Sequence, residues 1–209
     1  MLQIQPVVGR SDREAFVGAA ARQRELYGSR VLVLGAGGLG AEIAVRCAAF
    51  GARCTAVRRR PELGAPPGFE RVLGTDGIDT ELARTDIVVI SAPATPRTRT
   101  LMSRARLSML PPHAIVVNVA RGSLLDEEAL ADLLEAGALR GAVLDVTATE
   151  PLAPGSRLWQ LRSVLLTPHV SAVSPGGFWT RQLALFLDNW RRYVSGQPLR
   201  NVVDKSEGY

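Results

Sequence analysis

The fold is decided by the stretch Arg30-Val31-Leu32-Val33-Leu34-Gly35-Ala36-Gly37-Gly38-Leu39-Gly40. Its apolar first half predicts a buried strand, and the residues that follow, Gly38–Phe50, read as a helix. The spacing Gly-x-Gly-x-x-Gly is weak evidence on its own. It gains meaning where it joins a strand to a helix, because that is the context of a dinucleotide-binding turn.

Each glycine of the turn has a physical role in such a site. Gly35 permits the tight turn, Gly37 lets the backbone approach a pyrophosphate, and Gly40 allows the helix to pack closely on the strand. Gly38 and Leu39 lie at the start of the helix, where free N–H groups and the helix dipole favour phosphate. A turn that binds nothing is the simpler alternative and stays open.

Strand and helix patterns alternate along the rest of the chain, which indicates βαβ units and a parallel sheet. Several strands are apolar almost throughout, as expected when helices cover both faces. We therefore predict an α/β fold, a doubly wound parallel sheet of the Rossmann type with flanking N- and C-terminal helices. The predicted strands are Arg30–Leu34, Arg53–Val57, Asp86–Ile90, Ala114–Val119, Ala142–Val146 and Val164–Thr167, and the predicted helices of this domain are Gly38–Phe50, Asp79–Arg84, Arg104–Leu110 and Asp126–Ala136.

Three regions follow from this reading. Residues 1–29 form an N-terminal arm with a polar helix at Asp12–Tyr27, and residues 30–175 form the dinucleotide-binding domain. Residues 176–209 contain a C-terminal helix, Gly177–Ser195, and a tail. The C-terminal helix carries apolar residues at helical spacing, so we expect one side of it to be covered.

Composition narrows the class of protein. The 209 residues carry a net charge of +5, almost all of it from arginine, since Lys205 is the only lysine. The arginines are scattered and nothing resembles a reading helix, so we do not expect nucleic-acid binding. The chain contains neither the ~20 apolar residues that span a bilayer nor a signal sequence, so we expect a cytoplasmic protein without a membrane partner. Cys47 and Cys54 have no metal-ligand spacing; we read them as buried, reduced thiols and predict no metal site.

Arginines follow the second predicted strand directly. In dinucleotide-binding folds this position contacts the adenine ribose, where an acidic residue favours NAD and an arginine can pair with the 2′-phosphate of NADP. Arg58 and Arg59 stand there, and no acidic residue does. Because a guanidinium binds phosphate in a fork, we predict a preference for NADP(H), with NAD(H) not excluded. A solvated arginine run is the alternative.

From Thr85 onward the chain contains several ordered motifs. They are Thr85-Asp86-Ile87-Val88-Val89, Ala92-Pro93-Ala94-Thr95-Pro96-Arg97-Thr98, Val117-Asn118-Val119-Ala120-Arg121-Gly122, Gly141-Ala142-Val143-Leu144-Asp145-Val146, Glu150-Pro151-Leu152, Leu166-Thr167-Pro168-His169 and the closing segment Gly196-Gln197-Pro198-Leu199. Through these motifs this part of the chain resembles the nucleotide-binding domain of the D-isomer-specific 2-hydroxyacid dehydrogenases. Together with the glycine turn, the resemblance extends from about Gly28 to Val203.

The resemblance implies that Arg121 binds the substrate carboxylate and keto oxygen, that His169 is the acid–base group and that Glu150 is its partner. The chemistry agrees, because a protonated imidazole can donate its proton to the oxygen that becomes negative as hydride arrives. An arginine can hold a carboxylate with two hydrogen bonds and so orient the carbonyl. The resemblance also places five weaker candidates beside the cofactor, namely Pro93, Pro96, Thr98, Ala120 and Asp145.

The chain departs from the family pattern at its start. Only 34 residues precede Gly35, too few for the family's N-terminal substrate domain, so the sequence is either part of a longer chain or a short natural form. We expect the apolar side of the C-terminal helix, or the N-terminal arm, to pack against another subunit in a homodimer. The leading interpretation is NADP(H)-dependent reduction of a small 2-keto acid, such as glyoxylate or hydroxypyruvate, to a D-2-hydroxy acid. The alternative is a cofactor-binding module that senses nucleotide or regulates a partner.

Overall fold

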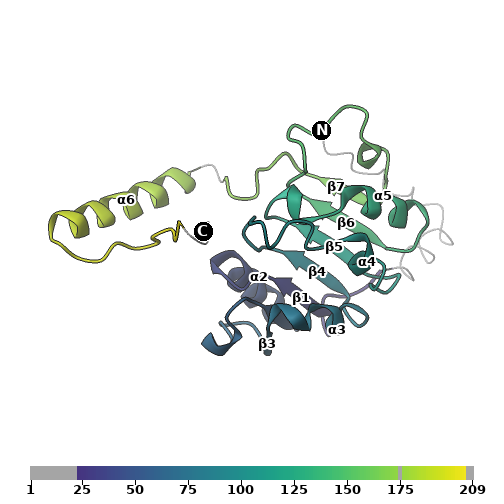
Figure 1. Ribbon diagram of the computed structural model, residues 1–209, viewed down its shortest axis with the longest axis horizontal. Coiled ribbons are helices and arrows are strands. Elements are labelled where there is room, and N and C mark those ends of the chain that lie inside the picture. The colour runs from purple at the N-terminus through teal and green to yellow at the C-terminus, as the bar shows by residue number, and fades with distance from the viewer. Residues whose placement is uncertain (1–22, 174–175, 206–209) are drawn as a thin grey trace, which may run out of the picture.

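A seven-stranded, wholly parallel sheet forms the centre of the molecule (Figure 1). The computed structural model describes residues 23–173 and 176–205. The strands are β1 (Arg30–Leu34), β2 (Arg53–Val57), β3 (Arg71–Leu73), β4 (Ile87–Ile90), β5 (Ile115–Asn118), β6 (Gly141–Leu144) and β7 (Val164–Leu166). The helices are α2 (Gly38–Ala49), α3 (Ile78–Leu82), α4 (Arg104–Leu107), α5 (Glu127–Glu135) and α6 (Phe178–Val194), with short 3-10 turns at Pro61–Leu63, Thr75–Gly77, Gly122–Leu124 and Arg157–Trp159.

The strand order shows a doubly wound sheet. It runs β3-β2-β1-β4-β5-β6-β7, so the chain moves outward from β1 in one direction and then, from β4 onward, in the other. The loops that leave β1 and β4 therefore diverge at the carboxyl edge, which is where ligands bind in such sheets. This confirms the predicted fold class.

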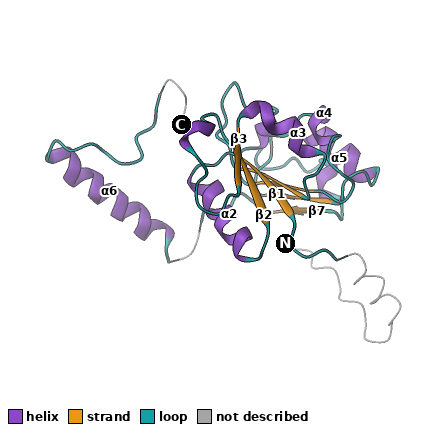
Figure 2. Ribbon diagram, turned by 90° about the horizontal axis from the view of Figure 1, so that it is seen from below, coloured by secondary structure: helices purple, strands orange, loops and turns teal. Residues whose placement is uncertain are grey.

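Helices cover both faces of the sheet, with α3, α4 and α5 on one side and α2 on the other (Figure 2). Alternation along β1 divides its side chains between two cores, since Leu32 and Leu34 pack with α3, α4 and α5 while Val31 and Val33 pack with α2. All four are at most 1% exposed. The near-continuous apolar strands are thus explained by burial on two faces.

Two features differ from the sequence-based expectation. The short edge strand β3 was not predicted, because its three residues follow a Pro- and Gly-rich stretch and provide no period to detect. The helix predicted at Asp12–Tyr27 is wrong over residues 23–27, which form a loop and a turn, while Asp12 to Arg22 lies outside the described residues. The turn is fixed by Gly28, which has φ 73° and donates its N–H to Gly51 O at 2.9 Å.

Other boundaries moved by a few residues. The strands β1 and β2 match the prediction, whereas the helix predicted at Arg104–Leu110 ends at Leu107 and the one at Asp79–Arg84 runs from Ile78 to Leu82. Asp126 caps α5 by accepting the Ala129 N–H at 3.0 Å, as its place at the start of that helix suggested. Cys54 is fully buried and Cys47 is half-buried, and both are free thiols.

The helix α6 projects away from the sheet (Figure 1). None of its residues is buried. Its exposed large apolar side chains are spaced so that they share one face of the helix and form one stripe, made of Trp179, Leu183, Phe186, Leu187, Trp190, Tyr193 and Val194. No helix in the described part of the chain combines the length and the apolar character needed to cross a membrane.

A pair of alanine substitutions tests the packing of the glycine turn. A Cβ on Gly40 would lie 2.0 Å from Gly35 O, whereas a Cβ on Gly38 would meet nothing within 4 Å. We expect Gly40→Ala to lower the free energy of unfolding by about 1–3 kcal/mol because the turn and α2 must move apart. Gly38→Ala is the matched control and is expected to be neutral or slightly stabilising. Urea unfolding measures both, and equal stabilities would contradict this account.

Candidate active site

An imidazole–carboxylate pair lies at the carboxyl edge of the sheet. His169 follows β7 and Glu150 follows β6, and His169 Nδ1 is 2.8 Å from Glu150 Oε2. Glu150 Oε1 also accepts the Thr147 N–H at 3.1 Å. The hydrogen bond with His169 lowers the pKa of Glu150, assisted by the Thr147 amide and by the positive charges of His169 and Arg121, although burial opposes the shift. A carboxylate is thereby kept ionised beside the ring.

The backbone of His169 is held in an unusual conformation. Its φ is 53°, in the left-handed region that residues other than glycine rarely adopt. Its N–H donates to Asp145 O at 2.8 Å and to Thr167 O at 3.0 Å. These bonds attach the turn after β7 to the neighbouring strand end, so the backbone that carries the imidazole is held in a fixed position.

Asp145 secures the same turn with its side chain. The carboxylate is 4% exposed and accepts hydrogen bonds from Thr167 Oγ1 at 2.5 Å and from the N–H groups of Val170 and Ser171, both at 3.0 Å. Burial would raise the pKa of Asp145, but the hydrogen bonds from Ser171, Thr167 and Val170 outweigh it and lower the pKa to about 2. The structure therefore gives Asp145 a role in holding the His169 loop.

Arg121 stands at the end of β5, in a turn held by a buried amide. Asn118 is fully buried; its Nδ2 donates to Arg121 O at 3.0 Å, and its Oδ1 accepts the Ala120 N–H at 3.1 Å. Arg121 itself is exposed, and its Nη1 donates to Ala120 O at 2.6 Å. The sequence did not predict this role of Asn118. The signal for it is a polar residue at the end of an apolar strand.

Two contacts join the Arg121 turn to the Glu150 loop. Gly122 lies so close to that loop that a Cβ on it would come within 1.9 Å of the Thr147 carbonyl carbon. Glu127, in the first turn of α5, accepts the Ala148 N–H at 2.5 Å. Burial raises the pKa of Glu127; the hydrogen bond from the Ala148 amide opposes this shift, and the charges of Glu128 and Glu150 add to it. Arg121, Glu150 and His169 are thus brought to one region of the sheet edge, and Glu127 is a supporting residue that sequence reasoning missed.

The glycine turn lies along the same edge. Gly35 has φ 107°, its N–H donates to Val57 O at 2.9 Å, and its carbonyl accepts the Ser91 hydroxyl at 2.8 Å. Ser91, which follows β4, was not singled out from the sequence. Gly37, Gly38 and Leu39 are exposed, and no side chain caps the start of α2. This leaves N–H groups of the first turn of α2 available for a phosphate.

Other predicted cofactor residues lie in the loops that follow β2 and β4. Arg58 is half-buried one residue after Val57, and its Nη1 donates to Gly64 O at 3.2 Å, while Arg59 is exposed. In the loop after β4, the Thr98 hydroxyl donates to Pro93 O at 2.7 Å and so stabilises that loop, and Pro96 is exposed. Within the described ranges, no group of three or more His, Cys, Asp or Glu side chains could hold a metal ion.

Comparison with known proteins identifies the family. The family profile described as "D-isomer specific 2-hydroxyacid dehydrogenase, NAD binding domain" matches residues 8–171. A D-3-phosphoglycerate dehydrogenase of Mycobacterium leprae is 41% identical over 150 residues, which are 71% of this chain and 28% of that protein. This chain therefore spans less than a third of that curated relative.

Solved structures give the same result. A D-isomer specific 2-hydroxyacid dehydrogenase of Xanthobacter autotrophicus Py2, solved with NADPH and MES, is 36% identical with a TM-score of 0.82 over 95% of this chain and 83% of that one. An NADPH-dependent glyoxylate/hydroxypyruvate reductase of Sinorhizobium meliloti, solved with NADP and sulfate, is 32% identical with a TM-score of 0.80 over 93% of this chain and 64% of that one.

The acid stability of the protein tests the role of Asp145. Because its pKa is about 2 in the folded chain and 3.8 is its ordinary value, its contribution of roughly 2 kcal/mol is complete above about pH 5 and is lost as the pH falls toward 2. Asp145→Asn should lower the free energy of unfolding at pH 6 and flatten its decline between pH 5 and pH 2.5. Urea unfolding across this range measures both effects. Parallel pH profiles for the two proteins would show that the carboxylate does not hold the loop.

Proposed function

The chain belongs to the family of D-isomer-specific 2-hydroxyacid dehydrogenases, and from this premise we propose that it reduces a small 2-keto acid to a D-2-hydroxy acid with a nicotinamide cofactor. The observation that carries the proposal is the 2.8 Å contact between His169 and Glu150, with Arg121 at the same sheet edge. The glycine turn at that edge supplies a phosphate site for the cofactor.

The geometry suits a proton donor beside a reacting carbonyl. The bound cofactor supplies the hydride. As negative charge develops on the carbonyl oxygen, a protonated His169 donates its proton to that oxygen while Glu150, bonded to Nδ1, holds the ring and stabilises its positive charge. Arg121 binds the substrate carboxylate through its guanidinium and so fixes which face of the carbonyl meets the nicotinamide.

The arginines after β2 support NADP(H) as the preferred cofactor. Arg58 lies one residue beyond Val57, whose carbonyl binds the amide of Gly35, so its backbone is next to the phosphate-binding turn. Two relatives were solved with NADPH or NADP. A 2′-phosphate would gain a charge-assisted hydrogen bond at this position, whereas NAD(H) would not. Arg59, Pro93, Pro96, Thr98 and Ala120 complete the proposed cofactor surface.

We infer the substrate class from the small number of polar side chains that are available to bind a substrate. One guanidinium and one imidazole can hold a carboxylate next to a keto group, as in glyoxylate or hydroxypyruvate, on which the Sinorhizobium meliloti relative acts by name. The loop Thr147-Ala148-Thr149 beside Glu150 carries only small side chains.

A second candidate function is a cofactor-binding module that senses nucleotide or regulates a partner. It is favoured by the open character of the site, since the side chains of His169 and Glu150 are 43% and 40% exposed. Water reaches both groups, and a hydride-transfer site normally excludes it. Turnover separates the two candidates.

We expect the protein to form a homodimer through α6. Its apolar side chains, including Trp190 at 56% exposure, form a contiguous stripe, and exposed apolar patches of this kind mark interaction surfaces. Sedimentation should therefore show a dimer, and Trp190→Glu should convert it to a monomer by placing a charge in the interface. A wild-type protein that stays monomeric at high concentration would contradict this expectation.

The two histidines of the chain provide a matched test of activity. NADPH oxidation with a panel of 2-keto acids should show turnover that His169→Gln lowers by about 10²–10⁴-fold, because the proton donor is lost. His113→Gln is the control, since His113 bonds Asp86 at the opposite edge of the sheet. NADPH binding should be unchanged in both. Tight NADPH binding without turnover on any 2-keto acid would instead support the second candidate.

Cofactor preference is tested at Arg58. Arg58→Asp removes a guanidinium that can donate hydrogen bonds to the 2′-phosphate of NADPH and introduces a carboxylate that can accept one from the ribose hydroxyl of NADH. The ratio of kcat/KM for NADPH to that for NADH should therefore fall at least about tenfold. Arg46→Asp is the control. It changes the charge by the same amount, but at the last turn of α2, where Arg46 pairs with Glu42. An unchanged ratio in Arg58→Asp would rule out its contact with the 2′-phosphate.

A further inference from the structure

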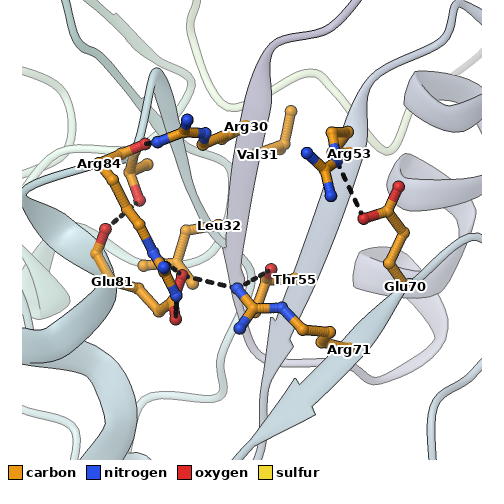
Figure 3. A pocket seen from close by; sticks show the side chains of 10 residues that line it. Arg30, Val31, Leu32, Arg53, Thr55, Glu70, Arg71, Glu81 and Arg84 are labelled. Carbon is orange, nitrogen blue, oxygen red and sulfur yellow. Dashed lines mark hydrogen bonds and ion pairs between the residues drawn. The ribbon is translucent and has the colours of Figure 1, made fainter.

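An arginine-rich cavity lies at the amino ends of β1, β2 and β3, on the edge opposite the glycine turn. Its volume is about 360 Å³, which is within the range of sites for small ligands. Figure 3 shows the arginines of three neighbouring strands around this space. The residues that matter below are Arg30, Arg53, Thr55, Arg71, Glu81 and Arg84.

The register of the parallel strands explains why the arginines lie close together. Each of the three strands begins with an arginine, and Arg30 pairs with Arg53 across the parallel ladder. Adjacent strands are about 4.8 Å apart, so the two cations start from neighbouring positions. Arg71 pairs with Thr55, two residues further along β2, and its guanidinium reaches back toward the cavity (Figure 3).

The positive charge exceeds the negative charge that faces it. The cavity is lined by four arginines and two glutamates, Glu70 and Glu81. Glu81 is 5% exposed and binds two of the arginines, with Arg71 Nη2 at 2.9 Å and Arg84 Nε at 2.9 Å. Repulsion between like charges this close is costly unless an anion offsets it, so a bound anion would stabilise the cluster.

The cavity is also pre-organised for such a ligand. Glu81 orients Arg71 and Arg84, the Arg30 guanidinium is tethered to Arg84 O at 3.4 Å, and Arg53 Nε is 3.2 Å from Glu70. Each guanidinium has more N–H groups than these contacts use. The nearly buried Thr55 hydroxyl accepts from Arg71 Nη2 at 3.4 Å, which leaves its own proton to donate.

We propose that this cavity is a second ligand site, which binds a small anion with two or more negative charges, such as a phosphorylated or polycarboxylate metabolite. Glu70 offsets the charge of Arg53, whereas Glu81 is shared by Arg71 and Arg84, so the four arginines keep an excess of positive charge over the two glutamates. Arg30 and Arg53 offer further N–H groups to the ligand, and the Thr55 hydroxyl can donate its proton to it. Guanidinium forks recognise phosphate and carboxylate alike, so the geometry defines the charge and the size of the ligand. The site is separate from the cofactor edge and does not depend on the proposed reaction.

The test is an NMR titration of the ¹⁵N-labelled protein with pyrophosphate and, separately, with citrate at low ionic strength. We expect saturable shifts at the amides of Thr55, Arg71 and Glu81. A stronger response to pyrophosphate would identify a phosphoryl ligand, and a stronger response to citrate a carboxylate ligand; either supports the site. Amides of the glycine turn, Gly37 to Leu39, report the cofactor site independently, so failure at one site is distinguished from failure at the other.

Three variants give the specificity control. Arg30→Gln and Arg53→Gln should each weaken the affinity by about tenfold, because each removes a charge-assisted contact. Arg104→Gln removes the same charge from an exposed ion pair with Asp132 elsewhere on the molecule and should leave the affinity unchanged. Both test residues are exposed at strand ends, and the preserved amide spectrum of either variant confirms that it folds. The proposal is overturned by shifts confined to the glycine turn, by no shifts with either anion, or by equal affinities in all three variants.

Discussion

The candidate site residues around the glycine turn and His169 depend on one constraint, which is that seven neighbouring strands run in the same direction. The hydrogen-bond ladder does not stop where the strands end. Gly35 N–H binds Val57 O, and Val119 N–H binds Ile90 O, so the first residues of each functional loop are still tied to the neighbouring strand. Because carboxyl ends of parallel strands meet at one edge, residues more than a hundred positions apart in the sequence lie along the same edge of the sheet.

Buried polar side chains hold the loop residues that lie beyond the reach of the backbone hydrogen bonds of the sheet. Asn118 and Asp145 end or follow β5 and β6, and both are almost completely buried. Burial of an amide or a carboxylate is unfavourable unless hydrogen bonds compensate for it, and here the compensating donors and acceptors belong to the turns that carry Arg121 and His169. The hydrogen bonds that offset the cost of burying Asn118 and Asp145 therefore also fix the positions of the turns that carry Arg121 and His169.

Sequence reasoning predicted the sheet and the pair His169–Glu150 but not the supporting contacts. The bounds of β1 and β2 were predicted to the residue, since long apolar runs next to glycine have few alternatives. The edge strand β3, with three residues, was missed for lack of a period. The loop-holding roles of Asp145 and Glu127 could not be predicted, because each depends on amides about 20 residues away whose position only the folded sheet defines.

The position of α6 has a consequence for the thermodynamics of the chain. A helix of 17 residues without a buried side chain contributes nothing to the two cores of the sheet, and helices little shorter than this are only marginally stable in water. Its helix–coil equilibrium is therefore local and need not follow the global unfolding of the sheet. Any surface that covers the apolar stripe also selects the helical state, so association there and ordering of the C-terminal region are linked equilibria.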